Sequence, residues 1–509
     1  RGRGTPLRRY STAVGGIGVR RRSCFIFSHA RIISARERRQ LFMTVKDLEL
    51  KAHLLRRAGF GASLTHLESI SERSYEDIVE DLLHPERFDL VDEDYLKRYT
   101  PELSYHDSHP LYAGKWIWKM INSERPLEEK MALFWHHVFA TGYSKSEHPP
   151  TLIAQIETFR LNGLSNLKTV FLDLAKDPAM NYWLDNCENH ADQPNENWGR
   201  ELLELFSMGV GNYSEDDIKQ ASRAFTGWTF EQPLPLYPSG QYESSFVYDP
   251  DDHDDSEKVF LGRRGHFNGE DIIDIICEEK ATALFISRHL YNFFVEDEPQ
   301  IPAWNIEPPK NPDAIDAMIS VLMENNGELK PLLRFMFNSD FFKEAMYKKV
   351  KNPSELIAGT LKLSGTYSVI PRSGETVGAL YAAASVMGQA LMNPPTVEGW
   401  HTGHEWIDGG TLNERVNFAV NQFNDLETPG FTEMLNKLGD SVQGSELVDR
   451  CLDLVGQFDI GAETREALGR YADAVGDIDL SNEQARSENA IKVARMIQLI
   501  VSTREYQFA

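Results

Sequence analysis

Apolar residues recur along this chain at intervals of three and four positions, the spacing that places them on one face of an α-helix. Similar stretches continue to the end of the sequence, so the predicted fold is mainly α, a multi-helix globular array. The clearest predicted helices lie in the first half of the chain: Ala52–Ala58, Tyr75–Leu83, Lys115–Asn122, Leu127–Ala140, Leu152–Leu161, Leu167–Ala175, Trp198–Ser207 and Asp217–Phe225.

Strict alternation of apolar and polar residues, the pattern of a β-strand, is rare. Its best examples, Ser245–Tyr248 and Val259–Leu261, flank the acidic turn Asp249–Asp255. A short β-hairpin is therefore predicted near residues 245–262. The longest run of small apolar residues, Val377–Met392, is shorter than the ~20 residues that cross a bilayer. We expect a buried core helix there and no membrane span.

Loops rich in proline divide the predicted helices into parts. The segment 299–313 contains five prolines and is predicted to be a linker. It follows an N-terminal helical part, residues 43–298, that carries most of the polar motifs. A second helical part is expected at 314–425 and a C-terminal helical part at 426–509.

The first 42 residues differ from the rest, with eleven arginines, one glutamate and no periodic apolar face. They are predicted to be disordered. One interpretation is a leader for export or for an organelle; the other is upstream sequence translated in frame, with Met43 as the true start. Helical, charged sequence follows Met43, and no apolar segment of ~7–15 residues follows the paired arginines. We therefore favour the second interpretation and a cytoplasmic location, with export or an organelle as the alternative.

The composition is ordinary for a soluble globular protein, with 41% hydrophobic and 26% charged residues. The net charge of −24 argues against nonspecific binding of nucleic acids, which depends on basic side chains that neutralise phosphates. The four cysteines form no CxxC pair and are too few for a disulfide framework in a chain of 509 residues.

The densest cluster of polar residues lies in Asn195–Phe206. At ~100° per residue, Asn197, Glu201 and Glu204 share one stripe of the predicted helix. Two carboxylates spaced this way can share a proton or bridge a divalent metal ion. We therefore predict Glu201 and Glu204 as catalytic groups and Asn197 as a substrate contact.

Arg200 lies beside this stripe, four residues after Glu196, at the spacing of a helical ion pair. As a catalytic group, Arg200 would fix an anionic part of the substrate, and Glu196 would bind metal. The alternative is a solvated helix face that carries an Arg–Glu ion pair.

His136 and His137 lie within the apolar segment Phe134–Phe139. Neighbouring histidines diverge by ~100° on a helix and cannot easily bind one metal ion together. One is expected to face a polar site as a metal ligand. The alternative is two core histidines bonded to backbone or carboxylate groups.

The acidic turn and the residues after it are the third candidate site. His253 is predicted as a catalytic group, Asp254 as a metal ligand, and Lys258 as a group that binds an anion or neutralises the turn. The segment lacks the glycine and glutamate of an EF-hand loop. The alternative is an acidic turn with a structural role. The sequence contains no GxSxG, HExxH or GxxxxGK[ST] motif.

Many of these motifs, taken in order, resemble the uncharacterised bacterial family called domain of unknown function 1800. The resemblance spans about Met43 to the end of the chain. It is carried by His53–Gly61, Lys130–Gly142, Asp177–Met180, Asn195–Phe206, Gly209–Tyr213, Ala224–Trp228, His253, Asp254, Lys258, Lys351, Pro353–Glu355, Asn393–Trp400 and Glu505–Gln507.

The resemblance implies no established activity and no established catalytic residues. Members are often encoded beside a second uncharacterised family that resembles sulfatases and alkaline phosphatases, and many carry export signals. Charged residues are costly to bury without partners. Motifs this polar therefore favour a shared pocket for Glu196, Arg200, Glu201, Glu204 and His253.

Two functional hypotheses follow. The first is a metal-assisted hydrolase with a carboxylate/His site in a helical core, a divalent metal ion, and Trp400 as a substrate contact. The second is a non-catalytic partner or scaffold for a sulfatase-like protein, docked through an exposed patch at Asn393–Trp406. Exposed tryptophans at 400 and 406 would suit such an interface. A cavity lined by the charged groups favours the first hypothesis, and ion pairs in solid packing favour the second.

Overall fold

The computed structural model describes residues 35–99, 108–232, 243–368, 374–456 and 460–509. Residues 46–509 fold as one compact unit, separate from residues 1–45. Most of the predicted leader at 1–42 lies outside the described residues. Its last part, from Ala35 onward, belongs to the first helix.

Helices make up most of the described chain, as the apolar spacing predicts, so the prediction of a mainly α fold is confirmed. The helices before the first strand are α1 (Ala35–Arg57), α2 (Leu64–Ser69), α3 (Tyr75–Leu83), α4 (Glu93–Tyr99), α5 (His109–Asn122), α6 (Pro126–Val138), α7 (Tyr143–Ser146), α8 (Pro149–Asn162), α9 (Leu167–Ala175), α10 (Pro178–Trp183), α11 (Asn197–Glu201) and α12 (Glu215–Ala224). Helices α3 and α9 begin and end at the predicted residues.

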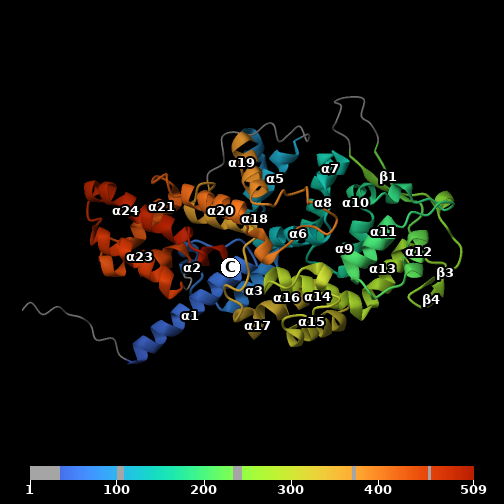
Figure 1. Ribbon diagram of the computed structural model, residues 1–509, viewed down its shortest axis with the longest axis horizontal. Helices are drawn as coiled ribbons and strands as arrows, with labels where there is room; N and C mark the ends of the chain where they lie inside the picture. The colour runs from blue at the N-terminus through green and yellow to red at the C-terminus, as the bar shows by residue number, and fades with distance from the viewer. Residues whose placement is uncertain (1–34, 100–107, 233–242, 369–373, 457–459) are drawn as a thin grey trace, which may run out of the picture. The chain divides into compact units, whose positions relative to one another are not determined.

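The second half of the chain is also helical (Figure 1). Its helices are α13 (Gly269–Glu278), α14 (Lys280–Phe294), α15 (Pro312–Glu324), α16 (Leu329–Asn338), α17 (Asp340–Lys343), α18 (Pro353–Ser364), α19 (Gly374–Val386), α20 (Gly409–Asn421), α21 (Pro429–Leu438), α22 (Leu447–Val455), α23 (Ala462–Val475) and α24 (Glu483–Val501).

Short side chains fix where several helices begin. Ser214 accepts a hydrogen bond from the amide of Asp217, whose side chain accepts in turn from the amide of Ser214, and the two bonds form a capping box at the start of α12. Ser74 caps α3 in the same way by accepting from the Asp77 amide. These contacts satisfy amides that have no partner within the helix.

The strands of the described chain form two-stranded antiparallel pairs. β1 (Trp228–Glu231) pairs with β2 (Ser245–Tyr248), β3 (Lys258–Phe260) with β4 (Arg263–Gly265), and β5 (Ser441–Val442) with β6 (Ile478–Asp479). Strands lie close to both predicted positions, but β2 and β3 do not pair with each other. The acidic turn therefore connects two hairpins: β2 pairs with the strand before it in the sequence, and β3 pairs with the strand after it.

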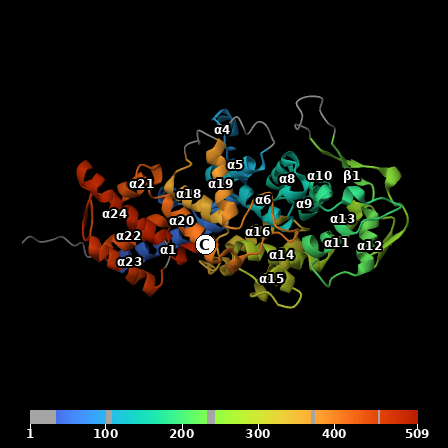
Figure 2. The same ribbon diagram turned by 45° about the horizontal axis from the view of Figure 1, so that its top comes forward.

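Helix α19 occupies most of the apolar run that was predicted to be a buried core helix. It packs along α5, where a Cβ atom on Gly114 would lie 2.0 Å from the carbonyl oxygen of Val377. Glycine is needed on α5 because the two backbones meet at this point. Helices α18, α19 and α20 lie beside one another (Figure 2).

Across the described ranges, we find no helix that combines the length and the apolar character needed to span a membrane.

Helix α6 packs against α5, α8 and α14, and it is buried almost all round. Its histidines therefore lie in the core rather than on a solvated face. The C-terminal helices α21–α24 pack together at one end of the 46–509 unit (red in Figure 1), and α11–α13 with β1–β4 lie at the other (green).

Candidate acid–base site

The polar cluster at Asn195–Phe206 begins as α-helix and continues as a π-helix. Helix α11 ends at Glu201, and Leu202–Ser207 form the π-helix η4. The Met208 amide donates to the Leu203 carbonyl at 3.0 Å, five residues back. The prediction of one α-helix through Ser207 is therefore wrong from Leu202 onward. Short π-helical turns are rare and often lie at functional sites.

Three carboxyl groups gather beside this turn. Glu201 and Glu204 come from α11 and η4, and Glu398 comes from the loop after α19. Glu204 and Glu398 line a cavity of about 180 Å³, which we call the acidic cavity. The Tyr213 hydroxyl donates to Glu204 at 3.2 Å. Glu201 and Glu204 were predicted site residues, and Glu398 was not.

Glu201 is partly buried and does not itself line the acidic cavity, but the charges of Glu204 and Glu398 act on it. Burial and the charge of Glu204 raise the pKa of Glu201 to about 7; Arg200 opposes them in part, and Glu398 adds a smaller upward effect. A carboxyl group with this pKa exchanges its proton near neutral pH. That is the property expected of a general acid or base.

The rest of the cavity wall is apolar with a few polar groups. Met208, Phe285 and Trp304 supply apolar surface, and Asn212 and Asn305 supply amides. Arg288 also lines the cavity, but its guanidinium group lies 2.8 Å from the Glu298 carboxylate and stacks over the ring of Trp304. Its charge is therefore neutralised inside the wall, and the cavity remains acidic.

Arg200 binds carboxylates instead of lining the cavity. Its guanidinium group lies 2.8 Å from Glu215 and 3.3 Å from Glu196, so the expected Glu196–Arg200 ion pair is present. The hydrogen bond to Glu215 is the main reason that the pKa of Arg200 is raised. Asn197 is exposed and donates to Asp185 at 3.4 Å.

His136 and His137 are both buried, together with Trp400. The Met392 amide donates to Nε2 of His136 at 2.9 Å, and the Trp400 ring lies 5.3 Å from the ring of His136 and 6.3 Å from that of His137. Burial lowers the pKa of His136 to about 3 and that of His137 to about 4, so both rings are neutral. His136 thus matches the alternative of a core histidine bonded to backbone, and His137 lies in the core with its Nε2 unpaired among the described residues.

The surface expected to dock a partner at Asn393–Trp406 does not expose its tryptophans. Trp400 is 4% exposed and Trp406 is 5% exposed. The expectation of an exposed tryptophan patch is therefore wrong. Trp406 packs with Val350, Ile407 and Phe508 instead of facing solvent.

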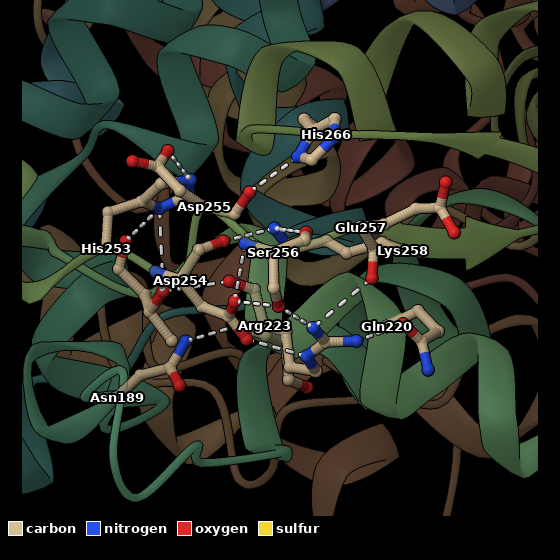
Figure 3. Close-up of polar contacts among 12 residues, drawn as sticks. Asn189, Gln220, Arg223, His253, Asp254, Asp255, Ser256, Glu257, Lys258 and His266 are labelled. Carbon is tan, nitrogen blue, oxygen red and sulfur yellow. Dashed lines mark hydrogen bonds and ion pairs between the residues drawn. The ribbon is translucent and has the colours of Figure 1, made fainter.

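The residues of the acidic turn bind one another and helix α12 (Figure 3). Arg223, in the last turn of α12, donates to the Asp254 carboxylate at 2.7 Å and also bonds Ser256. The Lys258 ammonium group donates to the main-chain carbonyls of Asp254 and Ser256. Burial opposes ionisation of Asp254, but the bonds from Arg223 and Ser256 outweigh it and hold its pKa well below the usual range. His253 contacts the Thr226 carbonyl through Nδ1 at 2.9 Å.

The acidic turn and the acidic cavity are separate sites. Glu215, which binds Arg200, and Arg223, which binds Asp254, stand eight residues apart on α12, about 12 Å at a rise of ~1.5 Å per residue. Of the five groups expected to share a pocket, only Glu204 lines the acidic cavity. Glu196 and Arg200 pair with each other, and His253 lies with the acidic turn.

The predicted metal ligands lie in different parts of the structure. Among the residues that the structure describes, no group of three or more His, Cys, Asp and Glu side chains could hold one. His136 and His137 lie in the core, Glu196 binds Arg200, and Asp254 binds Arg223. The four predicted metal ligands therefore lie in three separate places: the core, the Glu196–Arg200 pair and the acidic turn.

Two residues of these sites were not among the predicted site residues. Glu398 lies within the polar motif Asn393–Trp400, two residues before Trp400. Its position in that motif is the feature of the sequence from which it could have been predicted. Arg223 precedes the Ala224–Trp228 motif by one residue and carried no distinguishing signal of its own. Both contacts join segments that are far apart in the sequence.

Comparison with known proteins gives one match. The sequence model of a family described as "Protein of unknown function (DUF1800)" matches residues 53–508, most of the chain. Neither the curated proteins nor the solved structures contain a significant match.

Proposed function

We propose that this protein, which belongs to the DUF1800 family of proteins of unknown function, is a hydrolase that uses carboxyl groups as acid and base at the acidic cavity. One observation carries the proposal. Two carboxyl groups from distant segments, Glu204 and Glu398, line one cavity, and burial together with their charges raises the pKa of Glu201 to about 7.

The chemistry follows from a carboxyl group, Glu201, that exchanges its proton near neutral pH. The charges of Glu204 and Glu398 favour the protonated form of Glu201. A protonated group donates its proton to the leaving oxygen, and an ionised neighbour takes a proton from the attacking water. The water oxygen bonds to the reacting carbon as the bond to the leaving oxygen breaks. Glu204 and Glu398 contact the substrate because they line the cavity, and Glu201, which does not line it, supplies the exchangeable proton through Glu204.

The cavity wall favours an uncharged or cationic substrate. Carboxylates repel an anion, and the arginine in the wall is bound to Glu298. Arg200 is held by Glu196 and Glu215, so the expected role for its guanidinium group in binding an anionic substrate is not supported. Apolar surface from Phe285 and Trp304 suits a substrate with one apolar face, such as an ester or a glycoside.

The metal-assisted mechanism and the sulfatase-like partner are not part of this proposal. Because the predicted ligands lie apart, the proposal contains no metal-assisted step. A sulfatase-like partner and a cytoplasmic location stay predictions, and the surface first proposed for docking is buried at both tryptophans.

The proposal is tested by hydrolysis of neutral 4-nitrophenyl esters and glycosides, compared with 4-nitrophenyl phosphate and sulfate. We expect activity on neutral substrates and a loss of about 10²–10⁴-fold in kcat/KM for the Glu204→Gln variant. The matched control is Glu215→Gln, which removes an exposed carboxylate of α12 that lies outside the cavity; its kcat/KM should stay within about twofold. No hydrolysis of any neutral substrate, or equal rates for Glu204→Gln and the wild type, would contradict the proposal.

A further inference from the structure

A second polar region lies around Glu355 on α18, away from the acidic cavity. Lys130 lies 2.5 Å from the Glu355 carboxylate, and Arg57 lies 3.9 Å from it. The neighbouring buried carboxylate, Asp297, is bound by Lys349 at 2.8 Å. We call the following set the cationic cluster, with six cations and two carboxylates: Arg56, Arg57, Lys130, Lys349, Lys351, Arg415, Glu355 and Asp297.

Half of these cations bind neutral oxygens instead of carboxylates. Arg56 donates to the Gly456 carbonyl at 2.9 Å and to the Tyr347 hydroxyl at 3.1 Å. Lys351 donates to the Tyr506 carbonyl at 2.8 Å. Arg415, fully buried, donates to the side chain of Gln507 and to the Lys351 carbonyl. Within the described chain, none of the three has a carboxylate at ion-pair distance, so the cluster keeps an excess of positive charge.

The same region holds buried donors that lack acceptors. Within the described residues, Nε of Arg56, Nη1 of Arg57, Nη1 of Arg415 and Nε2 of Gln507 have no hydrogen-bond partner. Native proteins rarely leave such groups unpaired. Here the unpaired atoms are all donors in a positively charged region, and this combination is what an anion would satisfy.

A cavity of about 60 Å³ is lined by Arg56, Lys351, Glu355 and Tyr506, so one of the residues with an unpaired donor, Arg56, belongs to its wall. One water molecule needs about 10–15 Å³ of such space, so the cavity has room for a small oxyanion. The Glu355 carboxylate in the wall is bound by Lys130 and so does not oppose an anion strongly. A carboxylate at Ala509, the last residue of the printed sequence, would reduce the excess charge by one and leave it positive.

We propose that this cavity binds a tetrahedral oxyanion, phosphate or sulfate, through Arg56 and Lys351, with Arg415 behind Lys351. The inference is independent of the proposed function, since the acidic cavity shares no residue with this site.

The pH dependence of binding follows from Lys351. Burial and the charges of Arg56 and Arg415 lower its pKa to about 7; Arg57 adds to this effect, and Glu355 opposes it. A bound anion favours the protonated lysine, so binding takes up a proton, and affinity falls as the pH rises above 7. Sulfate is the suitable probe because it does not titrate in this range.

The test is calorimetric titration of the full chain with sodium sulfate at pH 6.5, against sodium chloride of equal ionic strength. We expect saturable sulfate binding, at least tenfold weaker at pH 8.5 and at least tenfold weaker in Arg56→Gln. Two controls should bind sulfate as the wild type does: Arg470→Gln, which removes an exposed arginine of α23 paired with Glu466, and Glu204→Gln in the acidic cavity. A parallel titration with inorganic phosphate at pH 6.5 shows which oxyanion binds more tightly.

A second readout covers the case in which Arg56→Gln does not fold. Thermal unfolding of the wild-type protein should show a midpoint that rises with the logarithm of the sulfate concentration from millimolar concentration upward, because a ligand of the native state stabilises it by mass action. A rise that is linear in sulfate concentration would indicate general salting-out. No saturable binding in the wild type, or equal binding in Arg56→Gln, would overturn the proposal.

Discussion

The acidic cavity and the acidic turn are similar in sequence and opposite in electrostatics. In the turn, Asp254 is bound by Arg223 and Asp252 by His190, and the pKa of each carboxyl group is lowered. In the cavity, carboxyl groups face one another, and the pKa of Glu201 is raised. The difference teaches that the number of acidic residues in a motif does not identify a reactive site. What identifies it is whether a cation from another element neutralises them.

The largest expected effect is on stability at the turn. Asp254→Ala leaves the partly buried Arg223 without its carboxylate, so the free energy of unfolding should fall by about 2–3 kcal/mol at pH 7. Because the pKa of Asp254 is lowered on folding, this contribution is present above about pH 4 and is lost as the pH falls further. Urea denaturation measures the change. Asp255→Ala, at an almost fully exposed neighbour, is the control and should change stability by less than about 0.5 kcal/mol. Equal effects of the two variants would show that the Arg223 contact is not a source of stability.

The opposite sign is expected in the cavity. The pKa of Glu201 is higher in the folded protein, about 7, than the ordinary ~4.3 of the unfolded chain. Its protonated form therefore favours folding, and this stability is lost as the pH rises through 7. Glu201→Gln should raise the free energy of unfolding by about 1–3 kcal/mol at pH 8 and by less at pH 5. A destabilised variant at pH 8 would indicate that Glu201 is held by a cation, like Asp254.

The sequence was sufficient for features set by neighbouring residues. The boundaries of α3 and α9, the Ser214–Asp217 capping box and the Glu196–Arg200 pair depend on spacings of three to four positions, which one helix fixes by itself. The placement of Glu201 beside Glu204 was predictable for the same reason.

Contacts across the fold were not predictable in this way. The approach of Glu398 to Glu201 depends on how the loop after α19 packs, and the Arg223–Asp254 bond depends on where the turn meets α12. The burial of Trp400 follows from packing against α6. The π-helix at Leu202 departs from the regular α-helix that the apolar spacing predicted.

A smaller effect distinguishes the two neighbours of Glu201. The charge of Glu204 raises its pKa more than that of Glu398 does. Replacement of either neighbour by glutamine should therefore lower the midpoint of the Glu201 titration, with the larger decrease in Glu204→Gln. The midpoint is read from proton release between pH 5 and pH 9. A larger decrease in Glu398→Gln would mean that the loop carboxylate is the closer partner.

The central claim is that repulsion and burial keep a proton on this carboxyl group near neutral pH. Its most direct test is a potentiometric difference titration of the wild-type protein against Glu201→Gln. We predict that the wild type releases one more proton than the variant between pH 5 and pH 9, with a midpoint near pH 7. A midpoint at or below pH 5, or no difference over this range, would contradict the account.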